Sequence, residues 1–227
     1  MRTVALPQDK AIPLIQSLEQ KTIPSSTAIL IIDMQNDFCS DKGILSSMWG
    51  LRLGAMQSLI QKLQKFLTVV RDRNVRVIFI KTARGPGDIS EPMEELMARH
   101  GGREYPCTKG SWGAELVDGI RPEPGESVIE KKRYSAFLGT DLDKILKKKG
   151  VRTLILTGVV TEVCVETTAR DAFMLDYHVL VVKELTASPY KVSYKASLAN
   201  IQRYFGVVVS SEELFQVWGS NPIKLQE

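Results

Sequence analysis

The feature that most constrains the fold is a set of short apolar runs separated by segments of helical pattern. The run TAILII at residues 27–32 has no apolar–polar alternation, and a second run, VRVIFI, follows at residues 75–80. Runs of this kind are typical of strands buried on both faces of a parallel sheet. Between them, residues 53–73 carry apolar side chains at helical spacing. This order of elements predicts strand, helix and strand again.

The same alternation continues to the end of the chain. It predicts the α/β class: a doubly wound, Rossmann-like parallel sheet of six strands in the order 3-2-1-4-5-6, with helices on both faces. We expect one domain over residues 1–227, in which residues 1–26 form an N-terminal arm on the body or on a neighbouring subunit. The remaining expected strands are residues 127–130, 151–157, 177–182 and 206–209, and the remaining helices are residues 91–99, 141–149, 189–205, 211–217 and one that begins near residue 161.

Composition excludes several classes of protein. No run of 18 apolar residues could span a membrane, and residues 1–20 hold no signal-peptide core. Three cysteines without paired spacing argue against a disulfide framework and predict a cytoplasmic location. The net charge of +4 is dispersed, so we expect no nucleic-acid partner and no membrane partner. The sequence shows neither a zinc pattern nor a glycine-rich phosphate loop, so we expect no metal and no cofactor.

Cys164 is the candidate nucleophile. It follows the fourth expected strand and a tight turn expected at Gly158. If Thr161 is the N-cap of the next helix, Cys164 is the third helical residue, where the helix dipole would lower the pKa of its thiol. A small buried core residue is an equally good interpretation of this stretch, because free cysteines are often buried.

Two further reactive residues are expected at the same edge of the sheet. Asp33 ends the first strand and Lys131 ends the third. Ligands of open parallel sheets bind outside the carboxyl ends of the strands, where the strand order reverses. The usual partner of a nucleophilic cysteine is histidine, but His178 is expected at the opposite end of the sheet and His100 in a long loop. We therefore expect Asp33 to take the thiol proton and Lys131 to hold that carboxylate.

The chain resembles the isochorismatase-like cysteine hydrolases, which include ureidoacrylate, biuret and N-carbamoyl amidohydrolases and nicotinamidases. The resemblance rests on three segments: AILIIDMQNDFC at residues 28–39, EKKRYSAFLGTDL at residues 130–142 and LTGVVTEVCVETTARDAF at residues 156–173. It implies that Asp33, Lys131 and Cys164 are catalytic and that a thioester forms on Cys164 during cleavage of a C–N bond in a small amide or ureide.

The resemblance also implies details of the pocket. Lys131 is preferred over Lys132 because the motif K-x-R-Y-S places the lysine two residues before Arg133. A cis peptide between residues 160 and 161 and an oxyanion hole built from the N–H groups of Thr161 and Cys164 are expected, and so is a homo-oligomer. The substrate-binding candidates, of which the aromatic ones could equally be core residues, are Asn36, Phe38, Arg84, Tyr134 and Phe137.

Three alternatives stay open. The segment KTARGPGDISEP after the second strand lacks the clustered histidines of a metal-dependent nicotinamidase, so any nicotinamidase activity would be metal-free. Cys164 and Arg170 have the C-x5-R spacing of cysteine phosphatases, but the residues between them contain no glycine and continue into a helix, which turns Arg170 away from Cys164. A non-catalytic scaffold of the same fold is the third alternative.

Overall fold

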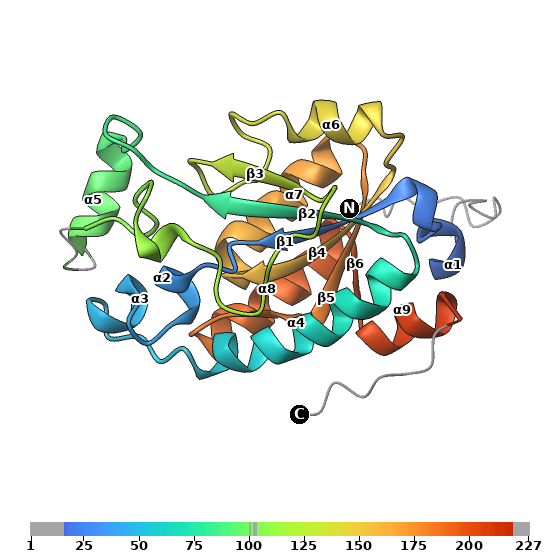
Figure 1. Ribbon diagram of the computed structural model, residues 1–227, viewed down its shortest axis with the longest axis horizontal. Coiled ribbons are helices and arrows are strands. Elements are labelled where there is room, and N and C mark those ends of the chain that lie inside the picture. Colours follow the sequence, from blue (N-terminus) through green and yellow to red (C-terminus); the bar gives the residue numbers. More distant parts are fainter. Residues whose placement is uncertain (1–15, 100, 102–103, 220–227) are drawn as a thin grey trace, which may run out of the picture.

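The computed structural model describes residues 16–99, 101 and 104–219. Within them, six strands form one all-parallel sheet in the order β3-β2-β1-β4-β5-β6 (Figure 1). The predicted fold class and strand order are therefore confirmed. The strands are β1 (Thr27–Ile32), β2 (Arg76–Thr82), β3 (Ser127–Lys131), β4 (Thr153–Val159), β5 (His178–Ala187) and β6 (Val207–Val209).

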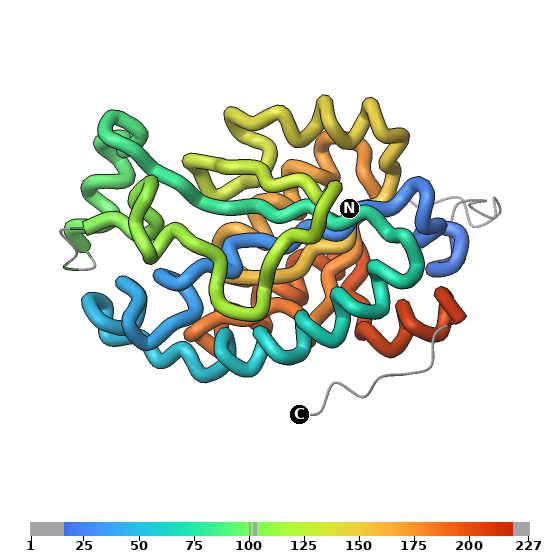
Figure 2. Tube along the Cα trace, in the orientation of Figure 1, coloured from blue at the N-terminus to red at the C-terminus, as the bar shows by residue number. Residues whose placement is uncertain are grey.

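Helices cover both faces of the sheet (Figures 1 and 2). Helices α4 and α9 pack on one face, and α6, α7 and α8 pack on the other. Helices α2, α3 and α5 lie at the carboxyl ends of the strands (Figure 1). The helices are α1 (Leu18–Lys21), α2 (Asn36–Cys39), α3 (Ile44–Ser47), α4 (Gly54–Asp72), α5 (Glu91–Arg99), α6 (Leu142–Lys148), α7 (Glu166–Met174), α8 (Lys191–Tyr204) and α9 (Ser211–Val217).

The central strand β1 explains why its sequence is apolar at every position. Ile29 and Ile31 lie in the core beneath α4, while Leu30 and Ile32 lie in the core beneath α6 and α7. All four side chains are fully buried. Successive residues of a strand point to opposite faces, so a strand covered on both sides needs apolar residues throughout.

The N-terminal segment that the structure describes packs on the body of its own chain. The indole Nε1 of Trp218, just after α9, donates to the carbonyl of Thr22 at 2.9 Å. Trp218 and Phe215 also contact Phe66 of α4, with ring centroids 6.5 and 5.7 Å away. Residues 16–26 are thereby attached to the α4–α9 layer; the earlier part of the expected arm lies outside the described residues.

The end of β4 differs from the prediction. Gly158 was expected in a tight turn after the strand, but it lies within β4, where the register with β5 shifts. Its φ is +104°, and a Cβ there would stand 2.0 Å from the carbonyl oxygen of Ile32 on β1. Glycine is required because β1 and β4 approach so closely. The cis peptide joins Val159 and Val160, one residue earlier than predicted.

The long segment between β2 and β3 returns along the carboxyl ends of the strands. Its predicted helix at residues 91–99 is present as α5, and a short 3-10 turn follows at Trp112–Ala114. An isolated bridge between Gln35 and Leu116 attaches the segment to the residues that follow β1, and a second bridge, between Arg84 and Thr108, joins two parts of the segment itself. The segment therefore forms one wall above the strand ends.

Candidate active site

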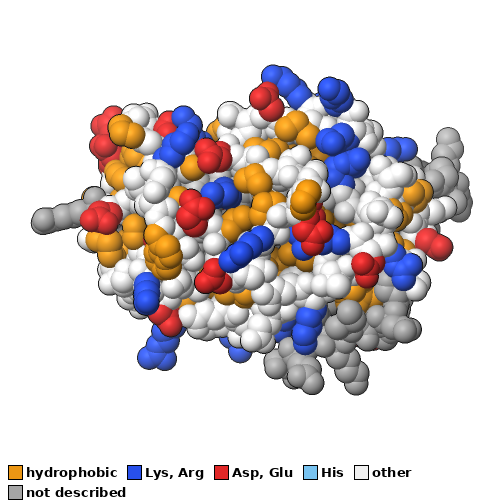
Figure 3. All heavy atoms as spheres, in the orientation of Figure 1, with side chains coloured by type: hydrophobic (Ala, Val, Ile, Leu, Met, Phe, Trp, Pro, Cys, Tyr) orange, Lys and Arg blue, Asp and Glu red, His pale blue; other side chains and the backbone are white. Residues whose placement is uncertain are grey.

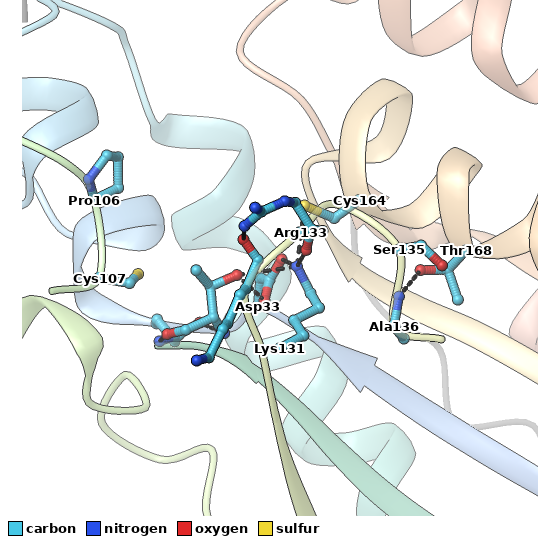
Figure 4. Close-up of polar contacts among 12 residues, drawn as sticks. Asp33, Pro106, Cys107, Lys131, Arg133, Ser135, Ala136, Cys164 and Thr168 are labelled. Atoms are coloured by element: carbon cyan, nitrogen blue, oxygen red, sulfur yellow. Dashed lines mark hydrogen bonds and ion pairs between the residues drawn. The ribbon is translucent and has the colours of Figure 1, made fainter. Parts of the chain in front are cut away.

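Three reactive side chains meet at the carboxyl edge of the sheet (Figure 4). Asp33 directly follows β1, Lys131 is the last residue of β3, and Cys164 lies in the turn after β4. The Nζ of Lys131 is 2.8 Å from Oδ2 of Asp33 and 3.5 Å from Sγ of Cys164. The structure thus brings together the three residues that the sequence placed at three separate strand ends.

Lys131 reaches the site across the neighbouring strand. β2 lies between β3 and β1 in the sheet, so the ammonium group must extend past the end of β2. Thr82, the last residue of β2, pairs with Lys131 in the register. Its hydroxyl accepts from Nζ at 2.9 Å and donates to Oδ1 of Asp33 at 3.0 Å. The carbonyl of Arg133 accepts from the same Nζ at 3.0 Å, so the ammonium is held on several sides.

Sequence reasoning missed Thr82 and Gln35, which fix this arrangement. The fully buried amide of Gln35 donates to the carbonyls of Thr82 and Ala114, both at 2.8 Å, and accepts from the Thr82 N–H at 2.7 Å. Asp33 has a φ of +51°, which a short polar side chain tolerates. Their positions could have indicated this role, because Thr82 is the last residue of β2 and Gln35 lies three residues after the end of β1.

The electrostatics of the site differ from the expectation for Cys164. Burial, followed by the negative charge of Asp33, raises the pKa of the thiol to about 12, although Lys131 acts in the opposite direction. Burial alone would lower the pKa of Lys131, but Asp33 and Cys164 raise it above its ordinary value. The resting site therefore holds a protonated thiol beside the ion pair of Asp33 and Lys131. The predicted lowering of the thiol pKa is wrong.

The turn that carries Cys164 is also different from the one expected. Thr161–Val165 is a π-helical turn that leads into α7, and its N-cap is Val160 rather than Thr161. The N–H groups of Val163 and Val165 both donate to the carbonyl of Val160, at 3.1 and 3.3 Å. Cys164 is therefore the fourth residue of the turn and not the third. π-Helical turns within helices often occur at functional sites.

A cavity of about 370 Å³ opens beside Asp33 and Cys164. Three of the substrate-binding candidates, Phe38, Arg84 and Tyr134, line it. Its remaining wall is mostly apolar and comes from residues 45–51, from α5, from residues 105–106, from the turn after β4 and from residues 189–190. Those lining residues include Leu45, Trp49, Met93, Leu96, Met97, Val160 and Val163.

The other two candidates lie outside this lining. The amide of Asn36 donates to the carbonyl of Trp112 at 2.9 Å, which attaches α2 to the long segment. Phe137 stacks on Tyr177 with ring centroids 6.0 Å apart, in the core beneath α6 and α7. Both side chains are occupied by packing within the chain, so their expected place in the pocket is corrected.

Glu162 was not singled out from the sequence, yet it lines the cavity next to Cys164. Its Oε1 accepts from the hydroxyl of Ser188 at 2.6 Å. Its Oε2 is buried, and among the described residues it has no hydrogen-bond partner. A buried carboxylate oxygen is costly to leave unpaired, so this atom is available to a donor on a ligand.

A family model described as the isochorismatase domain matches residues 27–213. The chain belongs to the isochorismatase domain family. The ureidoacrylate amidohydrolase RutB of Caulobacter vibrioides is 34% identical over 210 residues, which cover 86% of this chain and 92% of that protein.

Two solved structures show the same fold. A cysteine hydrolase from Pseudomonas syringae pv. phaseolicola is 25% identical, with a TM-score of 0.78 over 92% of this chain and 99% of that one. An N-carbamoylsarcosine amidase from Thermoplasma acidophilum is 29% identical, with a TM-score of 0.66 over 82% of this chain and 97% of that one.

The histidine and arginine that the sequence offered for other kinds of chemistry, His178 and Arg170, do not line the cavity of this isochorismatase-domain chain. His178 is exposed at the start of β5, the end opposite to Asp33, and His100 lies outside the described residues. The described residues hold no group of three His, Cys, Asp or Glu side chains arranged to bind a metal. Arg170, the last residue of the C-x5-R spacing, donates to Glu166 at 3.1 Å and lies over the ring of Phe205. It does not join Cys164 in the cavity lining.

The surface of this family member is mixed in charge. Figure 3 shows basic and acidic side chains interspersed on one face of the molecule. No helix among the described residues is long and apolar enough to cross a membrane. The expected absence of a nucleic-acid partner and the cytoplasmic location stay predictions.

Proposed function

We propose that this chain is a cysteine-dependent amidohydrolase that cleaves a C–N bond of a small ureide. The observation that carries the proposal is the contact of Lys131 with both Asp33 and Cys164 at one end of a cavity large enough for a small molecule. A nucleophile, a proton acceptor and a fixed positive charge are the groups that acyl transfer needs.

The first half of the reaction forms a thioester. The Cys164 sulfur attacks the substrate carbonyl carbon while its proton passes to the Asp33 carboxylate. The C–N bond then breaks, and Asp33 returns the proton to the departing nitrogen. Because burial and the charge of Asp33 raise the thiol pKa, the proposed step transfers the proton to Asp33 as the S–C bond forms. Lys131 holds the carboxylate in place and offsets the negative charge that develops at sulfur.

The second half restores the enzyme. Water attacks the thioester carbonyl and gives its proton to Asp33, and the S–C bond breaks as Asp33 returns a proton to the sulfur. The N–H groups of Thr161 and Cys164 are the proposed oxyanion donors in both halves. Their turn is fixed by the two hydrogen bonds to the Val160 carbonyl, and a fixed donor of this kind contributes about 2.7–4 kcal/mol to the transition state.

A ureide fits the cavity better than a simple amide for one physical reason. It carries N–H donors on both sides of the scissile carbonyl, and Glu162, whose Oε2 has no partner among the described residues, lines the cavity beside the nucleophile. The relatives named for ureidoacrylate and for N-carbamoylsarcosine support the same class of substrate. A metal-free nicotinamidase is the second candidate, because aromatic side chains such as Trp49 could pack on a pyridine ring.

A substrate panel with ammonia release as the readout tests this function. The panel holds ureidoacrylate, biuret, an N-carbamoyl amino acid and nicotinamide. We expect at least one ureide to be hydrolysed, no turnover by Cys164→Ala, and wild-type rates for Cys39→Ala as the matched cysteine control. Turnover of nicotinamide alone would favour the second candidate, and silence across the panel would favour a non-catalytic scaffold.

A further inference from the structure

Arg84 is a buried cation that the proposed mechanism does not use. It lies two residues after β2, and only 7% of its surface is exposed. Its side chain lines the same cavity as Asp33 and Cys164. Arginine is rarely buried unless an opposite charge lies beside it, so a group that balances the charge of this guanidinium is expected in the protein or in its ligand.

No acidic side chain pairs with Arg84 among the described residues. Its Nε donates to the carbonyl of Lys132 at 3.3 Å, and its Nη1 donates to the carbonyl of Pro106 at 3.1 Å. Both acceptors are neutral. A guanidinium has five N–H donors, so these two bonds leave donors available, and its positive charge is not offset.

The buried acids around the site do not form an ion pair with Arg84. Asp33 is paired with Lys131. Asp37 is buried, but its two carboxylate oxygens accept from the backbone N–H groups of Ile44 and Cys107, at 3.1 and 2.6 Å. Glu162 lines the same cavity, but no ion pair joins it to Arg84: its Oε1 accepts from Ser188, and its Oε2 has no partner among the described residues. The charge of Arg84 is therefore left for something that enters the cavity.

The position of Arg84 is fixed before a ligand arrives. Its backbone N–H donates to the carbonyl of Cys107 at 3.1 Å, and its carbonyl accepts from the N–H of Lys109 at 2.8 Å. The side chain is held on two sides, by the carbonyl of Pro106 in the segment that follows α5 and by the carbonyl of Lys132 directly after β3. A preorganised group binds its ligand with little loss of conformational freedom.

We propose that Arg84 binds a carboxylate group of the substrate, so that the enzyme acts on ureido acids and not on neutral ureides. This inference rests on the proposed function. Arg84 then receives the anionic end of the substrate through its remaining N–H groups, while the ureido end lies beside Cys164 and donates to Glu162. Guanidinium and carboxylate match in planar, bidentate geometry, and the pair is strong where water is excluded.

Matched acid and ester substrates test the proposal. Ammonia release is measured from ureidoacrylate and from its methyl ester, which has the same ureide but no negative charge. The wild-type protein should prefer the acid in kcat/KM. Arg84→Gln should lower kcat/KM for the acid by about 10- to 100-fold, chiefly through KM, and leave the ester unchanged, because only the acid makes the charged hydrogen bonds.

Two further variants make the test specific. Lys109→Gln removes an exposed cation from the same segment, and it should leave both substrates unaffected. Arg84→Lys keeps the positive charge but loses the planar guanidinium that can bind a carboxylate with two parallel hydrogen bonds. Its preference for the acid should therefore lie between those of the wild type and Arg84→Gln. Equal losses for acid and ester in Arg84→Gln would show that Arg84 only holds the chain in place, and a wild-type protein that hydrolyses the ester as well as the acid would overturn the proposal.

Binding separates this inference from the proposed function. If neither compound releases ammonia, the proposed function fails, but calorimetry on the Cys164→Ala protein still compares the affinities of acid and ester. The inference predicts at least tenfold tighter binding of the acid, and loss of that preference when Arg84→Gln is added. Equal affinities for the two compounds would contradict it.

Discussion

At the scale of single residues, Asp33 and Lys131 depend on each other because both are shielded from water. Each is fully buried, and their charged atoms are 2.8 Å apart. Removing one partner leaves the other charge buried without compensation. The pair therefore links the stability of the sheet edge to the chemistry of Cys164.

We expect Lys131→Met to lower the free energy of unfolding by about 3–5 kcal/mol, the range for breaking a buried ion pair. Adding Asp33→Asn should restore part of that loss, because no unpaired charge then remains. Urea denaturation of the two single variants and the double variant measures this. Additive losses in the double variant would show that the two residues do not act as a pair.

Asp33→Asn should separate reactivity of the thiol from turnover. The Asp33 charge raises the thiol pKa, so its removal should speed alkylation of Cys164 by iodoacetamide at a given alkaline pH. Hydrolysis should nevertheless fall by about 10²–10⁴-fold, because the proton acceptor is lost. Asp118→Asn, at an exposed loop position, is the control for both measurements. Slower alkylation in Asp33→Asn would contradict the account.

The raised thiol pKa also fixes the direction of the pH dependence. With a pKa of about 12, the fraction of thiolate rises with pH throughout the range in which iodoacetamide labelling is practical. The labelling rate of Cys164, followed by mass spectrometry of its peptide, should therefore increase steadily from pH 7 to pH 10. A plateau below pH 8 would mean that the thiol is ionised at rest, as the sequence alone had suggested.

At the scale of elements, the close approach of β1 and β4 positions the turn that carries Cys164. Gly158 allows that approach, because any side chain would meet the carbonyl of Ile32. Gly158→Ala should cost at least about 2 kcal/mol of stability, from the clash together with the positive φ. Gly54→Ala, where a Cβ meets nothing within 4 Å, should cost little. Thermal unfolding measures both, and similar midpoints for the two variants would be evidence against this role.

The layer formed by α4 and α9 should contribute stability without contributing chemistry. Phe66 is fully buried between Phe215 and Trp218, on the face of the sheet opposite α6 and α7. Phe66→Ala should lower the free energy of unfolding by about 3–5 kcal/mol and leave kcat of the folded protein close to that of the wild type. Chemical denaturation and steady-state kinetics test the two halves, and a large change in kcat would link this layer to the site.

At the scale of the whole molecule, the pattern of apolar residues in the sequence was sufficient to predict the parallel sheet and its strand order. The fully apolar sequence of β1 and the helical spacing of α4 predict a strand and a covering helix. With right-handed crossovers between parallel strands, few strand orders are then possible, and the predicted order is one of them. Asp33, Lys131 and Cys164 were predictable for the same reason, because parallel strands end at one edge.

What could not be predicted depends on contacts between distant parts of the chain. The pKa of Cys164 is set by burial and by Asp33, far away in sequence, and neither effect is visible in the TEVCV segment. The Oε2 of Glu162 and the charge of Arg84 both lack a partner among the described residues. The sequence could not show this, because it does not tell which side chains lie next to them in the fold. The expected homo-oligomer stays a prediction, which light scattering of the purified protein measures.

Rapid quenching of the wild-type protein with a turned-over ureide, followed by mass spectrometry, tests the central claim most directly. The account predicts a substrate-derived adduct on the Cys164 peptide that appears within one turnover and is absent from Cys164→Ala. An adduct on another residue, or continued hydrolysis by Cys164→Ala, would contradict it.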